Sequence, residues 1–321
     1  MSFKKIGVAG GGVLGSQIAY QSAYCGFNVT LWLRSEASVG RAASKIEKLH
    51  TMYAQAVALM ETSSNPSDFC RGLADEGEFD AAACREKNDA AFASIKYETD
   101  MAKAFADADL VIESVAENVP DKRAFYEKLA PLLPEKTVIV TNSSTLLPSQ
   151  FAQYTGRPEK FLSLHFANHI WKNNTAEVMV HPGTDMKYFD RVFAFAGEIR
   201  MLPLPVLKEK NGYLLNSMLV PFLLSGLDLY VNGISDPASI DKAWTRGTGA
   251  PRGPFEIFDV VGINTAYNIV TQYRKVPGLM SPLLRKMMMP YNFKGMEAAL
   301  KKMIDKGKLG RAAGEGFYKY K

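Results

Sequence analysis

A histidine and a glutamate suited to proton transfer lie twelve residues apart in the chain. His165 ends the apolar run FLSLH, and Glu177 lies at the start of the run AEVMV. Both runs are typical of buried strands, and the end of one strand can meet the start of the next at an edge of a sheet. A carboxylate beside an imidazole fixes the imidazole tautomer and stabilises the protonated ring. The pair is a candidate acid–base dyad, with a hydrogen-bonded structural histidine as the alternative.

Other polar side chains occupy positions that could bind a substrate. Asn142, Ser143, Ser144 and Thr145 follow the apolar run TVIVT. Hydroxyls there can orient a substrate oxygen, although a serine turn or a helix N-cap uses the same residue types. Asn216 lies in a largely apolar segment that predicts a buried helix. An unpaired buried amide costs about 1–3 kcal/mol, so Asn216 needs a partner from the protein or from a ligand.

A glycine-rich segment near the N-terminus has the spacing of a dinucleotide-binding turn. Gly10, Gly12 and Gly15 fit the pattern G-x-G-x-x-G, with Val13 and Leu14 before the third glycine. The segment follows a strand-like run and opens a helical pattern. Glycines allow the tight turn and a close approach to pyrophosphate, and the helix N-terminus supplies free N–H groups. The sequence therefore favours a site for NAD or NADP over an ordinary strand–helix turn.

The residues that choose between the two nucleotides differ from the usual NAD pattern. An acidic residue about twenty positions after the glycines normally binds the ribose 2′-hydroxyl. Leu33 occupies that place and is followed by Arg34 and Ser35. Leucine cannot accept the ribose hydrogen bond, whereas an arginine can pair with a 2′-phosphate. We expect a weakened preference for NAD over NADP; alternatively, Arg34 stacks on the adenine or points into solvent.

The elements that must position these residues divide the chain into two parts. Strand-like runs alternate with helical patterns up to about residue 200, which predicts an α/β fold with a doubly wound, mostly parallel sheet, a Rossmann domain, over residues 1–206. Strand signals stop near Pro203 and Pro205. Residues 207–321 are predicted to form a second, all-helical domain for substrate binding and dimerisation, with helices at 211–232, 236–246, 254–274, 281–288 and 293–306. The polar residues 61–90 predict a surface excursion with short helical pieces.

Composition excludes several classes of protein. The chain has 321 residues, of which 47% are hydrophobic and 22% charged, so it does not have the composition of a disordered protein. Three cysteines without CxxC spacing argue against a disulfide framework or a metal site. A net charge of +5 without basic runs argues against nucleic acid as a partner. No signal peptide or bilayer-length apolar run is present, which predicts a cytoplasmic location without a membrane partner.

Seven motifs, in order, resemble the 3-hydroxyacyl-CoA dehydrogenase family. They are GGGVLGSQIA, VIESVAEN, TNSST, LHFAN…AEVM, GYLLNSMLVP, GTGAPRGPFEIFD and GEGFYKY. The resemblance covers the whole chain except residues 61–90. The segments TNSSTLLPS and HFAN–x–x–W–x–NNTAEVM are most similar to diketoreductase-type members. The resemblance implies an NAD(P)-dependent oxidoreductase of fatty acid metabolism that interconverts 3-hydroxyacyl and 3-oxoacyl compounds by hydride transfer.

The resemblance also implies a role for individual residues. His165 would be the general base and acid on the substrate 3-oxygen, oriented by Glu177, while Ser144 and Asn216 would hold the substrate. Residues matching cofactor contacts are the glycine turn (Gly10, Gly12, Val13, Leu14, Gly15), the end of the second strand (Leu33, Arg34) and Glu117, Lys122, Asn142 and Asn168. Independently of the resemblance, the apolar stretches 213–227 and 283–289 predict a homodimer interface, with a core or a substrate-facing wall as the alternatives for Met287, Met288 and Met289.

Departures from the family pattern leave the substrate open. Acyl-CoA enzymes usually have HFFNPVPVMKLVE where this chain has HFANHIWKNNTAE, and a common lysine near the C-terminus is Ala312, beside Arg311. Trp171 could reshape the acyl end of the pocket or simply pack under a loop. One alternative is therefore a reductase of non-CoA 3-oxo acids, esters or diketones. Another is a dinucleotide-binding protein without turnover.

Overall fold

The chain divides into two compact units, Met1–Leu214 and Leu215–Lys321. The computed structural model describes residues 3–274 and 291–320. The division lies close to the predicted boundary between residues 206 and 207. Each unit is built around its own hydrophobic core.

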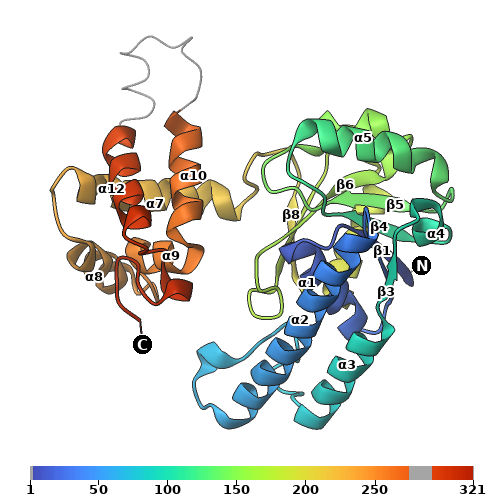
Figure 1. Ribbon diagram of the computed structural model, residues 1–321, viewed down its shortest axis with the longest axis horizontal. Helices are drawn as coiled ribbons and strands as arrows, with labels where there is room; N and C mark the ends of the chain where they lie inside the picture. Colours follow the sequence, from blue (N-terminus) through green and yellow to red (C-terminus); the bar gives the residue numbers. More distant parts are fainter. Residues whose placement is uncertain (1–2, 275–290, 321) are drawn as a thin grey trace. The chain divides into compact units, whose positions relative to one another are not determined.

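An eight-stranded sheet forms the centre of the larger unit (Figure 1). Its order is β3–β2–β1–β4–β5–β6–β7–β8, and every neighbouring pair is parallel except β6 and β7. This confirms the predicted α/β class and the mostly parallel sheet. The strands are β1 (Lys5–Ala9), β2 (Asn28–Trp32), β3 (Lys96–Glu98), β4 (Leu110–Glu113), β5 (Val138–Thr141), β6 (Phe161–Phe166), β7 (Thr175–Met179) and β8 (Leu202–Val206).

Helices cover both faces of this sheet because its central strands bury side chains on both sides. Along β4, Leu110 and Ile112 join one hydrophobic core and Val111 joins the other, as the two-residue repeat of a strand requires. The first core packs against α1 (Val13–Tyr24), α2 (Glu36–Thr62), α3 (Ala81–Ser94) and α6 (Met186–Glu198). The second packs against α4 (Met101–Phe105) and α5 (Val119–Leu129).

Strand β8 is a correction to the predicted end of the strand signals. The segment Leu202–Val206 pairs in parallel with β7 although it contains Pro203 and Pro205. Proline cannot donate to a ladder, but an edge strand needs only one hydrogen-bonded side. Because β8 is the last strand of the sheet, its prolines are tolerated there.

The predicted excursion at residues 61–90 is smaller and more regular than expected. Helix α2 extends to Thr62 and α3 begins at Ala81, capped by the Asp80 carboxylate, which accepts from the Ala83 N–H at 3.0 Å. The residues between these helices are irregular apart from the short 3-10 helix Pro66–Asp68. The two helices pack side by side and project from the sheet (Figure 1).

The smaller unit is helical, as expected. Its helices are α7 (Leu215–Val231), α8 (Pro237–Thr248), α9 (Pro254–Val261), α10 (Ile263–Arg274) and α12 (Phe293–Asp305). The single helix predicted over 254–274 is wrong, because the chain breaks between α9 and α10 at Gly262. The helix expected at 281–288 and the apolar stretch 283–289 lie outside the described residues. Among the helices that are described, none has both the length and the apolar character to cross a bilayer.

Candidate active site

The turn between β1 and α1 requires its glycines. Gly10 has φ of +109°, and a Cβ there would lie 2.5 Å from the backbone oxygen of Ser114. A Cβ on Gly15 would collide with the Gly10 carbonyl oxygen. Gly12 differs, because a Cβ there would meet no protein atom within 4 Å. The turn therefore packs tightly against the sheet and leaves its outer side open.

The open side of this turn suits an anion. Helix α1 has no acidic residue in its first turn, and its N-cap residue, Gly12, offers no side-chain hydrogen bond. The first N–H groups and the positive end of the helix dipole are therefore free for a phosphate. These features fit a nicotinamide dinucleotide, whose pyrophosphate would be held by Gly10, Gly12, Val13, Leu14 and Gly15.

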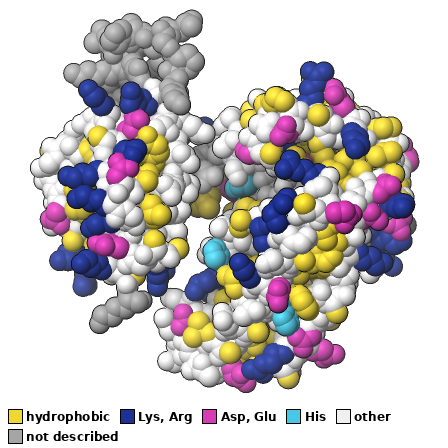
Figure 2. Space-filling model, in the orientation of Figure 1, with side chains coloured by type: hydrophobic (Ala, Val, Ile, Leu, Met, Phe, Trp, Pro, Cys, Tyr) yellow, Lys and Arg dark blue, Asp and Glu magenta, His cyan; other side chains and the backbone are white. Residues whose placement is uncertain are grey.

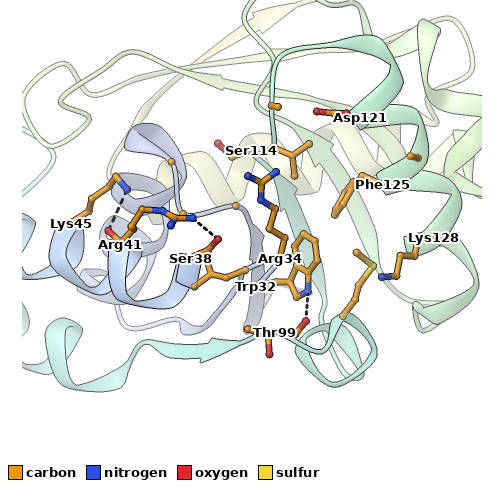
Figure 3. A pocket seen from close by; sticks show the side chains of 18 residues that line it. Trp32, Arg34, Ser38, Arg41, Lys45, Thr99, Ser114, Asp121, Phe125 and Lys128 are labelled. Carbon is orange, nitrogen blue, oxygen red and sulfur yellow. Dashed lines mark hydrogen bonds between the residues drawn. The ribbon is translucent and has the colours of Figure 1, made fainter. Parts of the chain in front are cut away.

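A pocket of about 650 Å³ continues from the turn across the ends of β1, β2 and β4 (Figure 3). Leu33 follows β2 at the position expected for a ribose-binding acid and is only 2% exposed. Its side chain lies against the turn, since a Cβ on Gly11 would come within 2.7 Å of Leu33 Cδ2. Arg34 is exposed and extends into the pocket near Ser114 (Figure 3). The far wall is formed by residues of α5, among them Asp121, Phe125 and Lys128.

The antiparallel pairing of β6 and β7 brings the predicted dyad together. His165 lies directly opposite Glu177 in the register. The Nδ1 atom of His165 lies 3.0 Å from Glu177 Oε2, and the Leu214 N–H donates to Glu177 Oε1 at 2.8 Å. His165 is 6% exposed and Glu177 3%. An ionised carboxylate only accepts hydrogen bonds, so it selects the tautomer with hydrogen on Nδ1 and a free lone pair on Nε2.

The other nitrogen of His165 faces Ser144. The distance from Nε2 to Ser144 Oγ is 3.1 Å, so Ser144, His165 and Glu177 form a continuous chain of hydrogen bonds. The Tyr213 ring stacks on the imidazole, with ring centres 4.5 Å apart and an angle of 17°. The Tyr213 hydroxyl donates to the Ser143 carbonyl oxygen at 2.6 Å, and burial raises the pKa of this phenol. Tyr213 therefore packs as a neutral group against the His165 ring and the Ser143 backbone.

Glu117 holds the segment that carries Ser144. Its Oε1 atom accepts from the Ser143 hydroxyl at 2.6 Å, from the Ser144 N–H at 3.0 Å, and from the N–H and hydroxyl of Thr145, each at 3.0 Å. Burial acts to raise the pKa of Glu117, but these hydrogen bonds and the Lys122 ammonium outweigh it and keep the pKa below its usual value. Glu117 thus acts as an ionised clamp on residues 143–145.

Lys122 is a buried ion-pair residue. It is 1% exposed, and its Nζ lies 2.6 Å from Glu113 Oε1 and 3.4 Å from Glu117 Oε2. Glu113 also accepts from the hydroxyls of Tyr126 and Thr141, both at 2.7 Å. The buried Lys122 ammonium therefore stabilises the negative charge of Glu117. A direct contact between Lys122 and a cofactor stays a prediction.

Asn142 and Asn168, the two asparagines predicted to contact the cofactor, link elements at the carboxyl ends of the strands. Asn142 lies 3.4 Å from the Ser114 hydroxyl and accepts from the Phe166 N–H at 3.3 Å. Asn168 accepts from the Gln17 side chain of α1 at 2.7 Å. These contacts fix the loops around the open turn, and cofactor contacts by either residue stay predictions.

Trp171 packs under a loop, as one of its two interpretations proposed. It is 5% exposed, and its ring lies 5.1 Å from that of Tyr53. The Gly72 N–H donates to the Trp171 carbonyl oxygen at 3.0 Å. The segment between α2 and α3 therefore holds the loop that joins His165 to Glu177.

The predicted site residue Asn216 and the departure at Arg311 and Ala312 belong to the smaller unit. Asn216 lies on α7 and is half-buried, less than its apolar segment predicted. Arg311 and Ala312 lie in a short helical turn, where the Arg311 guanidinium is 5.6 Å from the centre of the Tyr320 ring. A role for Asn216 beside Ser144 and His165 stays a prediction.

Two features of the site are not among the predictions from the sequence. Tyr213 stacks on His165 although the two residues are far apart in the sequence, and no local sequence pattern predicts such a contact. Arg41 and Lys45 line the pocket from α2, and their signal was available. They follow Ser38 at steps of three and four residues along α2, so the three side chains share one helix face.

Family models match both parts of the chain. Residues 5–210 match the NAD binding domain of 3-hydroxyacyl-CoA dehydrogenase, and residues 212–320 match its C-terminal domain. Human mitochondrial hydroxyacyl-coenzyme A dehydrogenase is 30% identical over 318 residues, which cover 99% of this chain and 91% of that protein. The 3-hydroxybutyryl-CoA dehydrogenase of Clostridioides difficile is 26% identical, covering 98% of this chain and 99% of that protein.

Solved structures give the same result. A diketoreductase structure, described as showing dual catalysis of dicarbonyl compounds, has a TM-score of 0.83 and 44% identity, and the match covers 100% of both chains. FadB2 of M. tuberculosis has a TM-score of 0.77 and 25% identity, again over 100% of both chains. The chain is an NAD-binding oxidoreductase that belongs to the 3-hydroxyacyl-CoA dehydrogenase family.

Proposed function

We propose that this enzyme interconverts 3-hydroxyacyl and 3-oxoacyl compounds, with His165 and Glu177 as its acid–base dyad. The observation that carries the proposal is the continuous chain from Ser144 Oγ through His165 to Glu177. A base must be within hydrogen-bond reach of the proton it moves and must be held in one tautomer. Burial of both dyad residues strengthens these interactions because water does not screen them.

The roles of the side chains follow from their hydrogen-bonding capacity. In the oxidation direction, the free lone pair on His165 Nε2 accepts the proton of the 3-hydroxyl, and Glu177 stabilises the resulting imidazolium. In the reduction direction, the Nε2–H of the imidazolium and the Ser144 hydroxyl donate to the 3-oxygen, where negative charge develops. The nicotinamide cofactor, when bound, accepts or supplies the hydride exchanged with C3.

The proposal also includes further substrate and cofactor contacts and a homodimer. Asn216 holds the substrate from α7, and Glu117, Asn142 and Asn168 border the cofactor. Two copies of the chain form a homodimer through the helical unit, where Met218 and Ile234 are exposed and hydrophobic side chains lie beside charged ones on the visible face (Figure 2). Light scattering tests this, since a dimer has twice the 35.4 kDa chain mass and a monomer would contradict it.

A second candidate keeps the chemistry but not the CoA group. The diketoreductase structure is 44% identical, and the segment after His165 lacks the usual acyl-CoA pattern. On this alternative the enzyme reduces free 3-oxo acids, esters or diketones. An intact Ser144–His165–Glu177 chain argues against a protein that only binds dinucleotides.

Comparing two substrates separates the candidates. Oxidation of the reduced nicotinamide is followed by absorbance with acetoacetyl-CoA and with ethyl acetoacetate under identical conditions. A higher kcat/KM for the thioester supports the 3-hydroxyacyl-CoA activity. Equal or higher values with the ester would favour the diketoreductase-like candidate, and no turnover with either would contradict both.

A further inference from the structure

One wall of the nucleotide pocket carries three cationic side chains. Arg34 follows β2, and Arg41 and Lys45 extend from α2, with Ser38 on the same face of that helix (Figure 3). Steps of three and four residues place 38, 41 and 45 in line along one helix face. Three positive charges and Leu33 therefore border one pocket.

Four other arginines of the larger unit have a carboxylate partner, which these cations lack. Arg71, Arg85, Arg123 and Arg200 each form an ion pair with a glutamate or aspartate. Within residues 3–274 and 291–320, by contrast, no ion pair involves the three cations of this wall. Unpaired cations bordering a pocket are suited to an anionic ligand.

Hydrogen bonds within the wall orient the side chains of Arg41 and Lys45. Arg41 Nη2 donates to Ser38 Oγ at 2.8 Å, and Ser38 Oγ lies 3.0 Å from Ser35 Oγ. Lys45 Nζ donates to the Arg41 carbonyl oxygen at 3.3 Å. Neutral oxygens occupy only part of the five donors of Arg41 and the three of Lys45. The remaining donors can bind phosphate oxygens.

The carboxylates nearby are engaged elsewhere. Leu33 removes the acid that would repel a phosphate on the ribose. Glu36 accepts from the Thr99 hydroxyl at 2.8 Å, and Asp121, on the opposite wall, accepts from the Asn118 amide at 2.8 Å. Because the three cations outnumber Glu36, the α2 side of the pocket keeps a net positive charge.

We propose that Arg34, Ser38, Arg41 and Lys45 bind the 2′-phosphate of NADP(H), which makes the phosphorylated nucleotide the preferred cofactor. The inference rests on the nicotinamide dependence of the proposed function and adds the choice of nucleotide. A guanidinium presents a planar pair of donors to phosphate and can also stack on an adenine ring. Arg34 can make both contacts, so Arg41 is the cleaner probe of the phosphate.

The test measures binding without turnover. Calorimetry of the full chain compares adenosine 2′,5′-bisphosphate with adenosine 5′-monophosphate at one fixed ionic strength. We expect the bisphosphate to bind at least about tenfold more tightly, since only this ligand has a 2′-phosphate to accept charge-assisted hydrogen bonds from the wall. Equal affinities would overturn the inference.

Two variants and a control assign the effect to this wall. Arg41→Gln and Arg34→Gln should each weaken the bisphosphate about tenfold. Arg41→Gln should leave the monophosphate affinity within about twofold, whereas Arg34→Gln lowers it further if Arg34 stacks on adenine. Arg85→Gln, on α3, should change neither affinity. Equal losses for both nucleotides in Arg41→Gln would reject the phosphate contact.

The outcomes separate this inference from the proposed function. Reduction of a 3-oxo substrate with NADH, together with equal affinity for the two adenosine nucleotides, would overturn the inference and leave the function standing. The expected preference without turnover of any 3-oxo substrate would support the phosphate site and contradict the function.

Discussion

At His165, the tautomer decides whether the imidazole can act as a base. Glu177 accepts from Nδ1 on one oxygen and from the Leu214 N–H on the other, so its two oxygens are committed to two donors. This leaves Nε2 as the only nitrogen that can take a proton from substrate. The spacing of His165 and Glu177 could be recognised from sequence, but their direct opposition depends on the antiparallel pairing of β6 with β7.

Glu177→Gln tests this control of the tautomer. The amide oxygen can still accept from Leu214, so its NH2 group then faces Nδ1 and favours hydrogen on Nε2. A protonated Nε2 cannot act as base, and we expect kcat to fall about 10²–10⁴-fold with the fold intact. Glu198→Gln, an exposed residue of α6, is the matched control. A kcat within threefold of the parent enzyme, at about the precision of such assays, would refute the role of Glu177.

Among the elements, the loop after β5 depends on Glu117 for its position. Because four donors of residues 143–145 converge on one oxygen, neutralising Glu117 loosens the segment that carries Ser144. For Glu117→Gln we expect about a tenfold lower kcat and about 1 kcal/mol less stability at pH 7, a modest loss because 38% of this side chain is exposed.

The pH dependence of this stability difference has a definite sign. The pKa of Glu117 is lowered in the folded protein, so its charge stabilises the fold above the unfolded value of about 4.3. That contribution is lost as the pH falls below this value and through the folded pKa. Urea unfolding of both proteins should therefore show curves that differ at pH 7 and converge towards pH 3. A pH-independent difference for Glu117→Gln would contradict the clamp.

The segment between α2 and α3 positions the loop that joins the dyad residues. A Cβ on Gly72 would lie 2.7 Å from Trp171 Cα and 2.8 Å from its carbonyl oxygen. Gly72→Ala should therefore displace this loop, cost about 1–3 kcal/mol of stability and lower kcat. Gly77→Ala is the control, because a Cβ there meets nothing within 4 Å. The melting temperatures of the two variants are compared by thermal unfolding. Equal melting temperatures would show that the segment does not support the loop.

The elements also show where prediction from sequence succeeds and where it stops. The glycine turn was recognisable because its strand, spacing and helix all lie within about twenty residues. Strand β8 was missed because its prolines are acceptable only at an edge, which is a property of the assembled sheet. The helix α3 was underestimated because its alanine-rich, polar sequence has little amphipathic contrast. Tyr213 could not be placed because its contact with His165 spans distant parts of the chain.

For the whole molecule, the central prediction is that both units contribute to one reaction. Asn216 belongs to the helical unit, whereas Ser144 and His165 belong to the larger one. We expect Asn216→Ala to lower kcat about tenfold or more, as loss of a hydrogen bond to a developing charge should, without lowering the melting temperature. Asn268→Ala, an exposed residue of α10, should change neither. A loss of stability with normal turnover would make the Asn216 amide structural.

The most direct test of the account is single-turnover reduction of a 3-oxo substrate by His165→Gln. Nucleotide affinity is measured on the same sample, and His50→Gln, whose parent side chain bonds to Asp89 at 2.8 Å, is the control. We predict a rate about 10²–10⁴-fold below that of the parent enzyme, with nucleotide affinity unchanged. A rate within tenfold of the parent, a loss smaller than general acid–base catalysis supplies, would contradict the assignment of His165 as the acid–base group.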